Sequence, residues 1–320
     1  MNRVLAISII NYRTADLTIG CVQSVLDDLG NLDAEIIVVD NLSEDGSADQ
    51  IAAWIDTLPS GSPVRLLRST SNSGFSGGHN QGMASAHADY YLILNSDAVV
   101  RQGFLARILD AARRHPDAGF IAPRLEHEDG VTQISCFRFP NPLSELIRGA
   151  NSGPVTRMLQ AYDVPLGPDL DEDAIGWASF ACILVNGAMM RDIGPMDEGY
   201  FLYFEDAEYC LRARRAGWRI RRCPQAVAVH FRGGSGPVKS IAKARGRLPA
   251  YYYSSRTRFF YQAYGRVGLW LANMLWSAGR GLALLRRVFG RPSDNARAFE
   301  GRDIWTNILK PLGPRRAPGE

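Results

Sequence analysis

The acids Glu205 and Asp206 are the side chains best placed to carry out acid–base chemistry. They follow the aromatic-rich run 201–204 and precede a segment with helical spacing of apolar residues. Acids at the start of a helix often do no more than stabilise the helix dipole. A carboxylate held among aromatic rings can also acquire the raised pKa that a general base needs. Because neighbouring positions point in different directions, the two acids need not share one role.

A second candidate group is Asp97, which ends the segment Asn95-Ser96-Asp97 behind a strand-like run at residues 90–94. One carboxylate at such a strand end can hold Mg²⁺ or Mn²⁺ on a diphosphate, because phosphate oxygens and water supply the remaining ligands. His230 follows the apolar run 226–229 and could act as an additional ligand. The alternatives are a polar turn at Asp97 and a structural role for His230.

Two polar stretches could bind a nucleotide. Asp40 and Asn41 follow the apolar run 36–39, where a carboxylate can accept a hydrogen bond from an N–H group of a base. Residues 72–82 hold four glycines before a helical segment, and backbone N–H groups at such a place suit phosphate or sugar hydroxyls. The stretch matches neither a P-loop nor a dinucleotide fingerprint. A helix cap and a tight turn would explain both stretches without a ligand.

The elements that must position these residues alternate between strand and helix in the first third of the chain. Apolar runs predict strands at residues 4–10, 34–40, 64–67 and 90–94, and helical spacing predicts helices at 15–29, 47–57, 74–87 and 104–114. Such alternation predicts an α/β fold with a mostly parallel sheet, whose ligands bind beyond the carboxyl ends of the strands. Asn11, Asp40 and Asn95 lie at such ends.

The rest of the chain gives weaker signals. Residues 119–173 are rich in proline and glycine, which predicts irregular structure that could hold short antiparallel strands and a helix around 143–159. Strands are expected at 177–185 and 227–230, with a helix at 207–216 between them and a glycine-rich loop at 233–237. Two long helices are expected at 248–264 and 267–289.

Composition excludes several classes of protein. The 320 residues suffice for one large α/β domain or two smaller ones, and the net charge of +3 does not favour a nucleic-acid partner. The five cysteines form no close pair, which argues against a disulfide framework or a structural zinc site and favours a reducing compartment. The N-terminal run is expected to be a buried strand rather than a signal peptide.

The C-terminal tail raises the question of a membrane. Tryptophans and leucines at residues 269–276 are followed by arginines at 280–291, a pattern typical of a helix that lies in a membrane interface. A packing helix or a homodimer contact is the alternative. Arg256 and Arg258 could contact a diphosphate or could be solvated helix charges.

The order and spacing of these motifs resemble the family 2 glycosyltransferases, and within them the bacterial rhamnosyltransferase-like branch. The resemblance covers residues 4–235 and, more loosely, 251–260. The matching stretches are Ser8-Ile9-Ile10-Asn11-Tyr12, Val38-Val39-Asp40-Asn41, Asn72-x-Gly74-Phe75-x-Gly77-Gly78-x-Asn80-x-Gly82, Leu94-Asn95-Ser96-Asp97, Gly194-Pro195-Met196-Asp197-Glu198, Phe204-Glu205-Asp206, Arg212-x-x-x-x-Gly217-Trp218 and His230-x-x-Gly233-x-Ser235.

The resemblance implies a GT-A fold and an inverting transfer of a sugar from a nucleotide diphosphate. It implies a catalytic domain at residues 1–235, with a nucleotide-binding half at about 1–118 and an acceptor-binding half at about 119–235, and a helical extension at 236–320. Asp206 would be the general base with Glu205 in support, and Asp97 and His230 would hold Mg²⁺ or Mn²⁺. The implied nucleotide-binding residues are Asn11, Asp40, Asn41, Asn72, Gly74, Phe75, Asn80, Asn95 and Ser96. The implied contacts to acceptor or diphosphate are Trp177, Asp197, Glu198 and Arg256.

The expected donor is dTDP-L-rhamnose, with a UDP-sugar as the alternative, and the expected acceptor is a cell-surface glycan or a polyprenyl-diphosphate-linked saccharide. We expect a cytoplasmic protein, peripheral on the inner face of a bacterial membrane. A non-catalytic nucleotide-sugar-binding subunit is the competing hypothesis. Two positions depart from the usual family pattern: Asn95 replaces the first acid of Asp-x-Asp, and Phe180 replaces a glycine.

Overall fold

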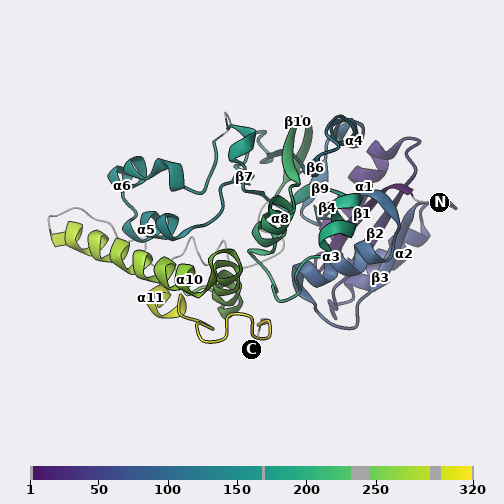
Figure 1. The fold of residues 1–320 in the computed structure, drawn as a ribbon. Helices are drawn as coiled ribbons and strands as arrows, with labels where there is room; N and C mark the ends of the chain where they lie inside the picture. The colour runs from purple at the N-terminus through teal and green to yellow at the C-terminus, as the bar shows by residue number, and fades with distance from the viewer. Residues whose placement is uncertain (1–2, 168–169, 232–245, 289–296, 319–320) are drawn as a thin grey trace.

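A mixed, eight-stranded sheet forms the centre of the protein in the computed structural model, which describes residues 3–167, 170–231, 246–288 and 297–318 (Figure 1). The strand order is β3-β2-β1-β4-β9-β6-β10-β5. The strands of this sheet are β1 (Arg3–Asn11), β2 (Ala34–Asp40), β3 (Val64–Arg68), β4 (Ala88–Asn95), β5 (Ala98–Val100), β6 (Ala118–Glu126), β9 (Cys182–Asn186) and β10 (Arg219–His230). A separate two-stranded sheet pairs β7 (Cys136–Phe137) with β8 (Trp177–Ala178).

Six helices cover the faces of the large sheet: α1 (Ala15–Leu29), α2 (Ser47–Asp56), α3 (Gly74–Ala84), α4 (Phe104–Arg114), α7 (Gly187–Ile193) and α8 (Glu205–Arg215). The other helices of the described residues are α5 (Pro142–Ala150), α6 (Gly153–Met158), α10 (Ala250–Val288) and α11 (Glu300–Asp303), and the short 3-10 turns are η1 (Gln160–Tyr162) and η2 (Glu172–Ala174). One core cluster holds Val22 of α1 and Ile108 of α4, and another holds Met83 of α3 and Tyr209 of α8.

The nucleotide-type half of the sheet has the arrangement that the sequence predicts. β1 pairs in parallel with both β2 and β4, and β2 pairs in parallel with β3. These strands are apolar on both faces because helices cover both sides, which is typical of parallel sheets. Their carboxyl ends therefore bring the residues after β1, β2 and β4 to one edge.

Four predicted elements differ in the structure. Residues 119–173 were expected to hold short antiparallel strands in an irregular region, yet β6 is a nine-residue strand that pairs in parallel with β10 as well as antiparallel with β9, and its Gly119 and Pro123 fit this pairing. The strand expected at 177–185 is split into β8 and β9. The helix expected at 143–159 breaks between α5 and α6, where Asn151 adopts a left-handed conformation with φ of 43°. The strand expected at 227–230 begins earlier, at Arg219, with a register shift after Cys223.

The C-terminal helix α10 is interrupted at Gly265, whose φ is 68°. This interruption confirms the expectation of two helical stretches. The second stretch packs tightly against α5, since a Cβ atom on Gly149 would lie 2.2 Å from the carbonyl oxygen of Trp276. Figure 1 shows the two helices side by side. The predicted glycine-rich loop, with Gly233 and Ser235, and the predicted domain boundary lie outside the described residues.

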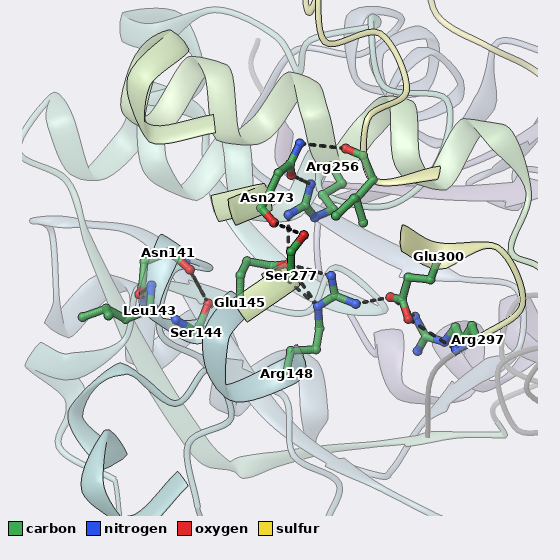
Figure 2. Close-up of polar contacts among 11 residues, drawn as sticks. Asn141, Leu143, Ser144, Glu145, Arg148, Arg256, Asn273, Ser277, Arg297 and Glu300 are labelled. Atoms are coloured by element: carbon green, nitrogen blue, oxygen red, sulfur yellow. Dashed lines mark hydrogen bonds and ion pairs between the residues drawn. The ribbon is translucent and has the colours of Figure 1, made fainter. Parts of the chain in front are cut away.

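A buried polar network connects α5, α10 and α11 (Figure 2). Glu145 accepts hydrogen bonds from Arg148 and from Arg256, and Arg148 also pairs with Glu300. Arg256 donates a further bond of 2.7 Å to Asn273. Burial raises the pKa of Glu145, but the guanidinium groups of Arg148 and Arg256 outweigh it and lower this pKa to about 2. Glu145 is therefore ionised at neutral pH and neutralises part of the buried positive charge.

Candidate active site

The segment that carries the acidic pair is anchored on a glycine of α3. The backbone N–H of Phe75 donates a 2.8 Å hydrogen bond to the carbonyl oxygen of Phe201. Gly74 has a φ of +71°, and a Cβ atom there would lie 2.2 Å from the same oxygen. Only glycine allows this approach, because any larger residue would collide with the backbone of the segment.

The two residues before the acids adopt a backbone conformation that side chains rarely tolerate. Tyr203 has a φ of 73° and Phe204 a φ of 68°. Consecutive left-handed residues other than glycine persist only where the surrounding structure holds them, and they are concentrated at functional sites. The turn ends at Glu205, the first residue of α8, so both acids lie at a helix N-terminus.

Aromatic side chains of α10 hold this turn in place. Tyr203 stacks on Tyr251, and Phe204 packs edge-on against Tyr252, with ring centroids 5.6 Å apart. The hydroxyl of Ser255 also donates a hydrogen bond to the carbonyl oxygen of Leu202. The C-terminal extension thus forms one wall of the candidate site.

Both acids have raised pKa values, for partly different reasons. Burial raises the pKa of Asp206 to about 7, although the backbone N–H groups of Ala207 and Phe180 oppose this shift by hydrogen bonding to the carboxylate. Burial, and then the charge of Asp206, raise the pKa of Glu205 well above its usual value. One carboxyl oxygen of Glu205 has no hydrogen-bond partner among the described residues. An acid that ionises near pH 7, beside a second acid whose pKa is also raised, suits a general base with a supporting partner.

The antiparallel pairing of β5 with β10 brings the predicted metal ligands together. Ala98 is paired with His230, and the Nε2 atom of His230 lies 3.3 Å from an Oδ atom of Asp97. Both side chains are buried. No cluster of three or more potential ligands occurs in the described part of the chain. A carboxylate and an imidazole fit a divalent ion that takes its remaining ligands from diphosphate oxygens and water.

A cavity of about 440 Å³ unites these groups with much of the predicted nucleotide site. It lies beyond the carboxyl ends of β1, β2 and β4, as expected for this type of sheet. The predicted residues that line it are Asn41, Asn72, Gly74, Phe75, Asn95, Ser96, Asp97, Trp177, Glu205, Asp206 and His230.

Six other predicted residues are not among the described side chains that line this cavity: Asn11, Asp40, Asn80, Asp197, Glu198 and Arg256. Asp40 is buried and accepts a 2.7 Å hydrogen bond from Asn11. Asn80 donates hydrogen bonds to the carbonyl oxygen of Met196 and to Glu198. Asp197 pairs with Arg258 of α10. In this structure these side chains support the loops around the cavity.

A second cavity, of about 430 Å³, lies on the other side of Asp206. It shares Trp177, Tyr203 and Asp206 with the first cavity. Its other walls come from α5, from residues 163–165 and from the start of α10. Arg256, for which a diphosphate contact was predicted, lines this second cavity, but it is almost fully buried and bonded to Glu145 and Asn273.

Several residues of the site had no predicted role. His79 lines the first cavity and is fully buried, with its Nδ1 atom 2.9 Å from the hydroxyl of Ser8. Burial lowers the pKa of His79 to about 3, so the ring is neutral at physiological pH. The position of His79 within the glycine-rich stretch at residues 72–82 is the sequence feature that could have indicated a role for it. Tyr203 and Tyr251 also line the cavity, but their proximity depends on contacts between distant parts of the chain.

Comparison with known proteins supports the expected family resemblance. Residues 6–155 match the family model described as Glycosyl transferase family 2. Over these residues the chain is similar to that family. The N-acetylglucosaminyl-diphospho-decaprenol L-rhamnosyltransferase of Mycobacterium tuberculosis is 28% identical over 278 residues, which cover 81% of this chain and 84% of that protein. Rhamnosyltransferase WbbL of Escherichia coli K12 is 26% identical over 165 residues, 48% of this chain and 60% of that protein. These relatives confirm the expected rhamnosyltransferase-like resemblance.

Solved structures confirm the expected GT-A fold. The mannosyltransferase PcManGT from Pyrobaculum calidifontis, in complex with GDP-Man and Mn²⁺, matches with a TM-score of 0.53 and 14% identity, covering 98% of this chain and 85% of that one. GalNAc-T7 with UDP, GalNAc and Mn²⁺ matches with a TM-score of 0.62 and 12% identity, covering 99% of this chain and 59% of that one. At these identities the likeness concerns the fold alone.

Proposed function

We propose that the protein is an inverting glycosyltransferase that binds a nucleotide-sugar in the first cavity and an acceptor in the second, with Asp206 as general base. The observation that carries this proposal is the place of Asp206, which lines both cavities and has a pKa of about 7. A base must reach the acceptor hydroxyl while facing the anomeric carbon of the donor, and a side chain between two cavities meets both requirements.

The proposed reaction is a single displacement. The acceptor oxygen bonds to the anomeric carbon, its proton passes to the carboxylate of Asp206, and the bond from the anomeric carbon to the diphosphate breaks with its electron pair on the diphosphate. A neutral Glu205 beside Asp206 avoids a second buried negative charge during this step. A divalent ion held by Asp97 and His230 would neutralise charge on the diphosphate.

The proposed donor is dTDP-L-rhamnose and the proposed acceptor is a lipid-linked saccharide, because the names of the relatives from M. tuberculosis and E. coli specify rhamnosyl transfer and the former a decaprenol-linked substrate. A UDP-sugar remains the alternative donor. The reaction would then take place in the cytoplasm, at the inner face of a bacterial membrane. The proposed catalytic domain ends at about residue 235. In this proposal α10 forms a wall of the site and is not a separate module.

A donor screen tests the proposal. Thermal shift and donor hydrolysis are measured with dTDP-L-rhamnose, UDP-sugars, NAD and ATP, each with and without Mg²⁺ or Mn²⁺. Stabilisation and hydrolysis with a sugar nucleotide support the proposal, whereas stabilisation by NAD or ATP alone would refute it. If D206N keeps both donor binding and sugar transfer, the assignment of the base is wrong.

A matched pair of variants tests the role of Asp97 in metal binding. D97N should lose at least tenfold in donor affinity in the presence of Mn²⁺ and little in EDTA, because the carboxylate that holds the ion is gone. D89N is the control, since Asp89 is an exposed acid near the start of β4, the strand whose far end leads to Asp97. Isothermal titration calorimetry measures both. Equal Mn²⁺ dependence in D97N and wild type would contradict the assignment.

A further inference from the structure

The second stretch of α10 exposes a row of large apolar side chains to solvent. We call this row the outer face and define it as Val267, Trp270, Leu271, Met274, Leu282 and Leu285. Val267 is 81% exposed and Met274 57% exposed. Spacings of three and four residues place these side chains on one side of the helix, over a length of about 27 Å.

Apart from Trp270, whose ring packs edge-on against Trp305, the outer face is not needed for packing within the chain. The opposite side of the helix already buries Leu269, Ala272, Trp276 and Ala283, and it contacts α5 and α11. A soluble helix normally has one apolar side and one polar side. Here both sides are apolar, and a large exposed apolar surface usually marks an interaction site.

The charges around the outer face favour one kind of partner. The sequence contains no Asp or Glu between Glu208 and Asp294. Arg266 is exposed at the start of this stretch, whereas Arg280 and Arg286 are half-buried and Arg286 donates hydrogen bonds to the carbonyl oxygens of Ala150 and Asn151. A second copy of the same face would meet no acid on this stretch. A bilayer with anionic headgroups accepts an apolar row on a helix that carries cations and no acids.

We propose that the outer face lies flat in the headgroup region of an anionic lipid bilayer. The helix would rest on the surface rather than cross it, and in the described residues no helix is long and apolar enough to span a membrane. The proposal concerns an interaction surface that is separate from the two cavities.

Docking in this orientation would also bring the proposed acceptor cavity close to the bilayer. This consequence rests on the proposed function. α5 packs on the side of α10 that is opposite the outer face, and Ser144 and Ile147 of α5 line the second cavity. Packed helices lie about 8–10 Å apart. The wall of the second cavity formed by α5 therefore lies roughly two helix diameters or less from the headgroups, within reach of a saccharide whose lipid stays in the bilayer.

Vesicle flotation with the full chain tests the docking surface. Wild type should bind vesicles of phosphatidylglycerol and phosphatidylcholine, and binding should weaken on pure phosphatidylcholine and in high salt. The double variant L271D/M274D should bind at least tenfold more weakly, because two apolar side chains are replaced by acids that the anionic surface repels. Both positions are exposed, and an unchanged melting temperature verifies that the variant is folded.

M158D is the matched control, since Met158 is 76% exposed on α6 and is not part of the outer face. It should bind vesicles like wild type. The proposal fails if wild type does not bind anionic vesicles, if L271D/M274D binds as well as wild type, or if M158D is equally impaired. It also fails if sedimentation velocity shows a dimer in wild type that L271D/M274D abolishes, since the face would then be a contact between copies.

Donor hydrolysis in the absence of vesicles separates this proposal from the proposed function. L271D/M274D should hydrolyse the donor at the wild-type rate, because the outer face is not part of either cavity. Loss of vesicle binding with intact hydrolysis supports the docking surface. If no sugar nucleotide is bound by any variant, the proposed function fails while the vesicle result stands on its own.

Discussion

At the scale of single residues, the environment of Asp206 opposes stability while it gives the proposed general base a suitable pKa. Its carboxylate is largely removed from water and next to a second acid, and its raised pKa follows from that burial. Between the unfolded pKa of about 4 and the folded value of about 7, the folded protein binds more protons than the unfolded chain. The free energy of unfolding therefore falls as pH rises through this window.

The variant D206N should be more stable and nearly inactive. We expect its melting temperature at pH 8 to exceed that of wild type by at least roughly 2 °C, and the difference to shrink towards pH 4. We expect kcat to fall about 10²–10⁴-fold, because the acceptor hydroxyl loses its base. In wild type, kcat should rise with pH up to about pH 7 as Asp206 becomes ionised.

Asp197 provides a control of opposite sign. Burial raises its pKa, but the hydrogen bonds from Arg258, Gly199 and Gln262 outweigh burial and hold the pKa below its usual value. D197N should therefore lower the melting temperature at neutral pH, and its effect should diminish as acid protonates Asp197 in wild type. Differential scanning calorimetry across pH measures both variants. A stabilising D197N or a destabilising D206N at pH 8 would show that these environments are misassigned.

At the scale of elements, the site depends on how closely α3 approaches the turn at residues 201–204. The sequence marks the glycine-rich stretch, but not its contact with Phe201, which lies far along the chain. Likewise, the turn's left-handed residues Tyr203 and Phe204 carry no local signal, because bulky residues rarely adopt this conformation unless tertiary contacts impose it. The tyrosines of α10 supply such contacts.

A pair of glycine variants tests this contact. G74A should lower the free energy of unfolding by more than about 2 kcal/mol and reduce kcat, because the new Cβ atom displaces the carbonyl of Phe201 and, with it, the turn that leads to the proposed base. G130A is the control: Gly130 also has a positive φ, of +81°, but no atom lies within 4 Å of the position that its Cβ would occupy. It should cost only about 1 kcal/mol with full activity. Urea denaturation and initial rates measure both, and equal effects would rule out a special role for Gly74.

At the scale of the whole molecule, buried charges connect the C-terminal helices to α5. Arg256 is almost fully buried, and its partner Glu145 is ionised in the fold. Sequence spacing could not distinguish this structural arginine from a substrate ligand, because its carboxylate partner lies 111 positions earlier in the chain. Its burial makes Arg256 a support for the wall of the second cavity.

Removal of Glu145 should therefore destabilise the whole protein. E145A leaves Arg256 without its carboxylate partner and should cost about 3–5 kcal/mol of stability. Donor affinity should stay within about twofold of the wild-type value, since Glu145 does not face the first cavity. The control R3A breaks a half-exposed pair with Asp33 and should cost less than about 1 kcal/mol. Similar losses in chemical denaturation for the two variants would contradict the role of the network.

The sequence by itself determined the parallel half of the sheet and the residues at its strand ends. Apolar runs, helix periodicity and turn residues act over a few positions, so Asn41, Asn95 and Asp97 could be placed at one edge before any contact was known. Only the tertiary structure decided that the Asp40 side chain bonds to Asn11 and that β6 is a nine-residue strand of the central sheet. Those outcomes depend on pairing between segments far apart in the chain.

The same distinction applies to the charges and to α10. A pKa depends on burial and on neighbouring charges, which no local pattern contains, so the environment that raises the pKa of Asp206 emerges only from the assembled fold. The second stretch of α10 is apolar on both sides, and its sequence could not indicate which side would be buried. Packing against α5 buries Trp276 and leaves Met274 in solvent, and this choice creates the outer face.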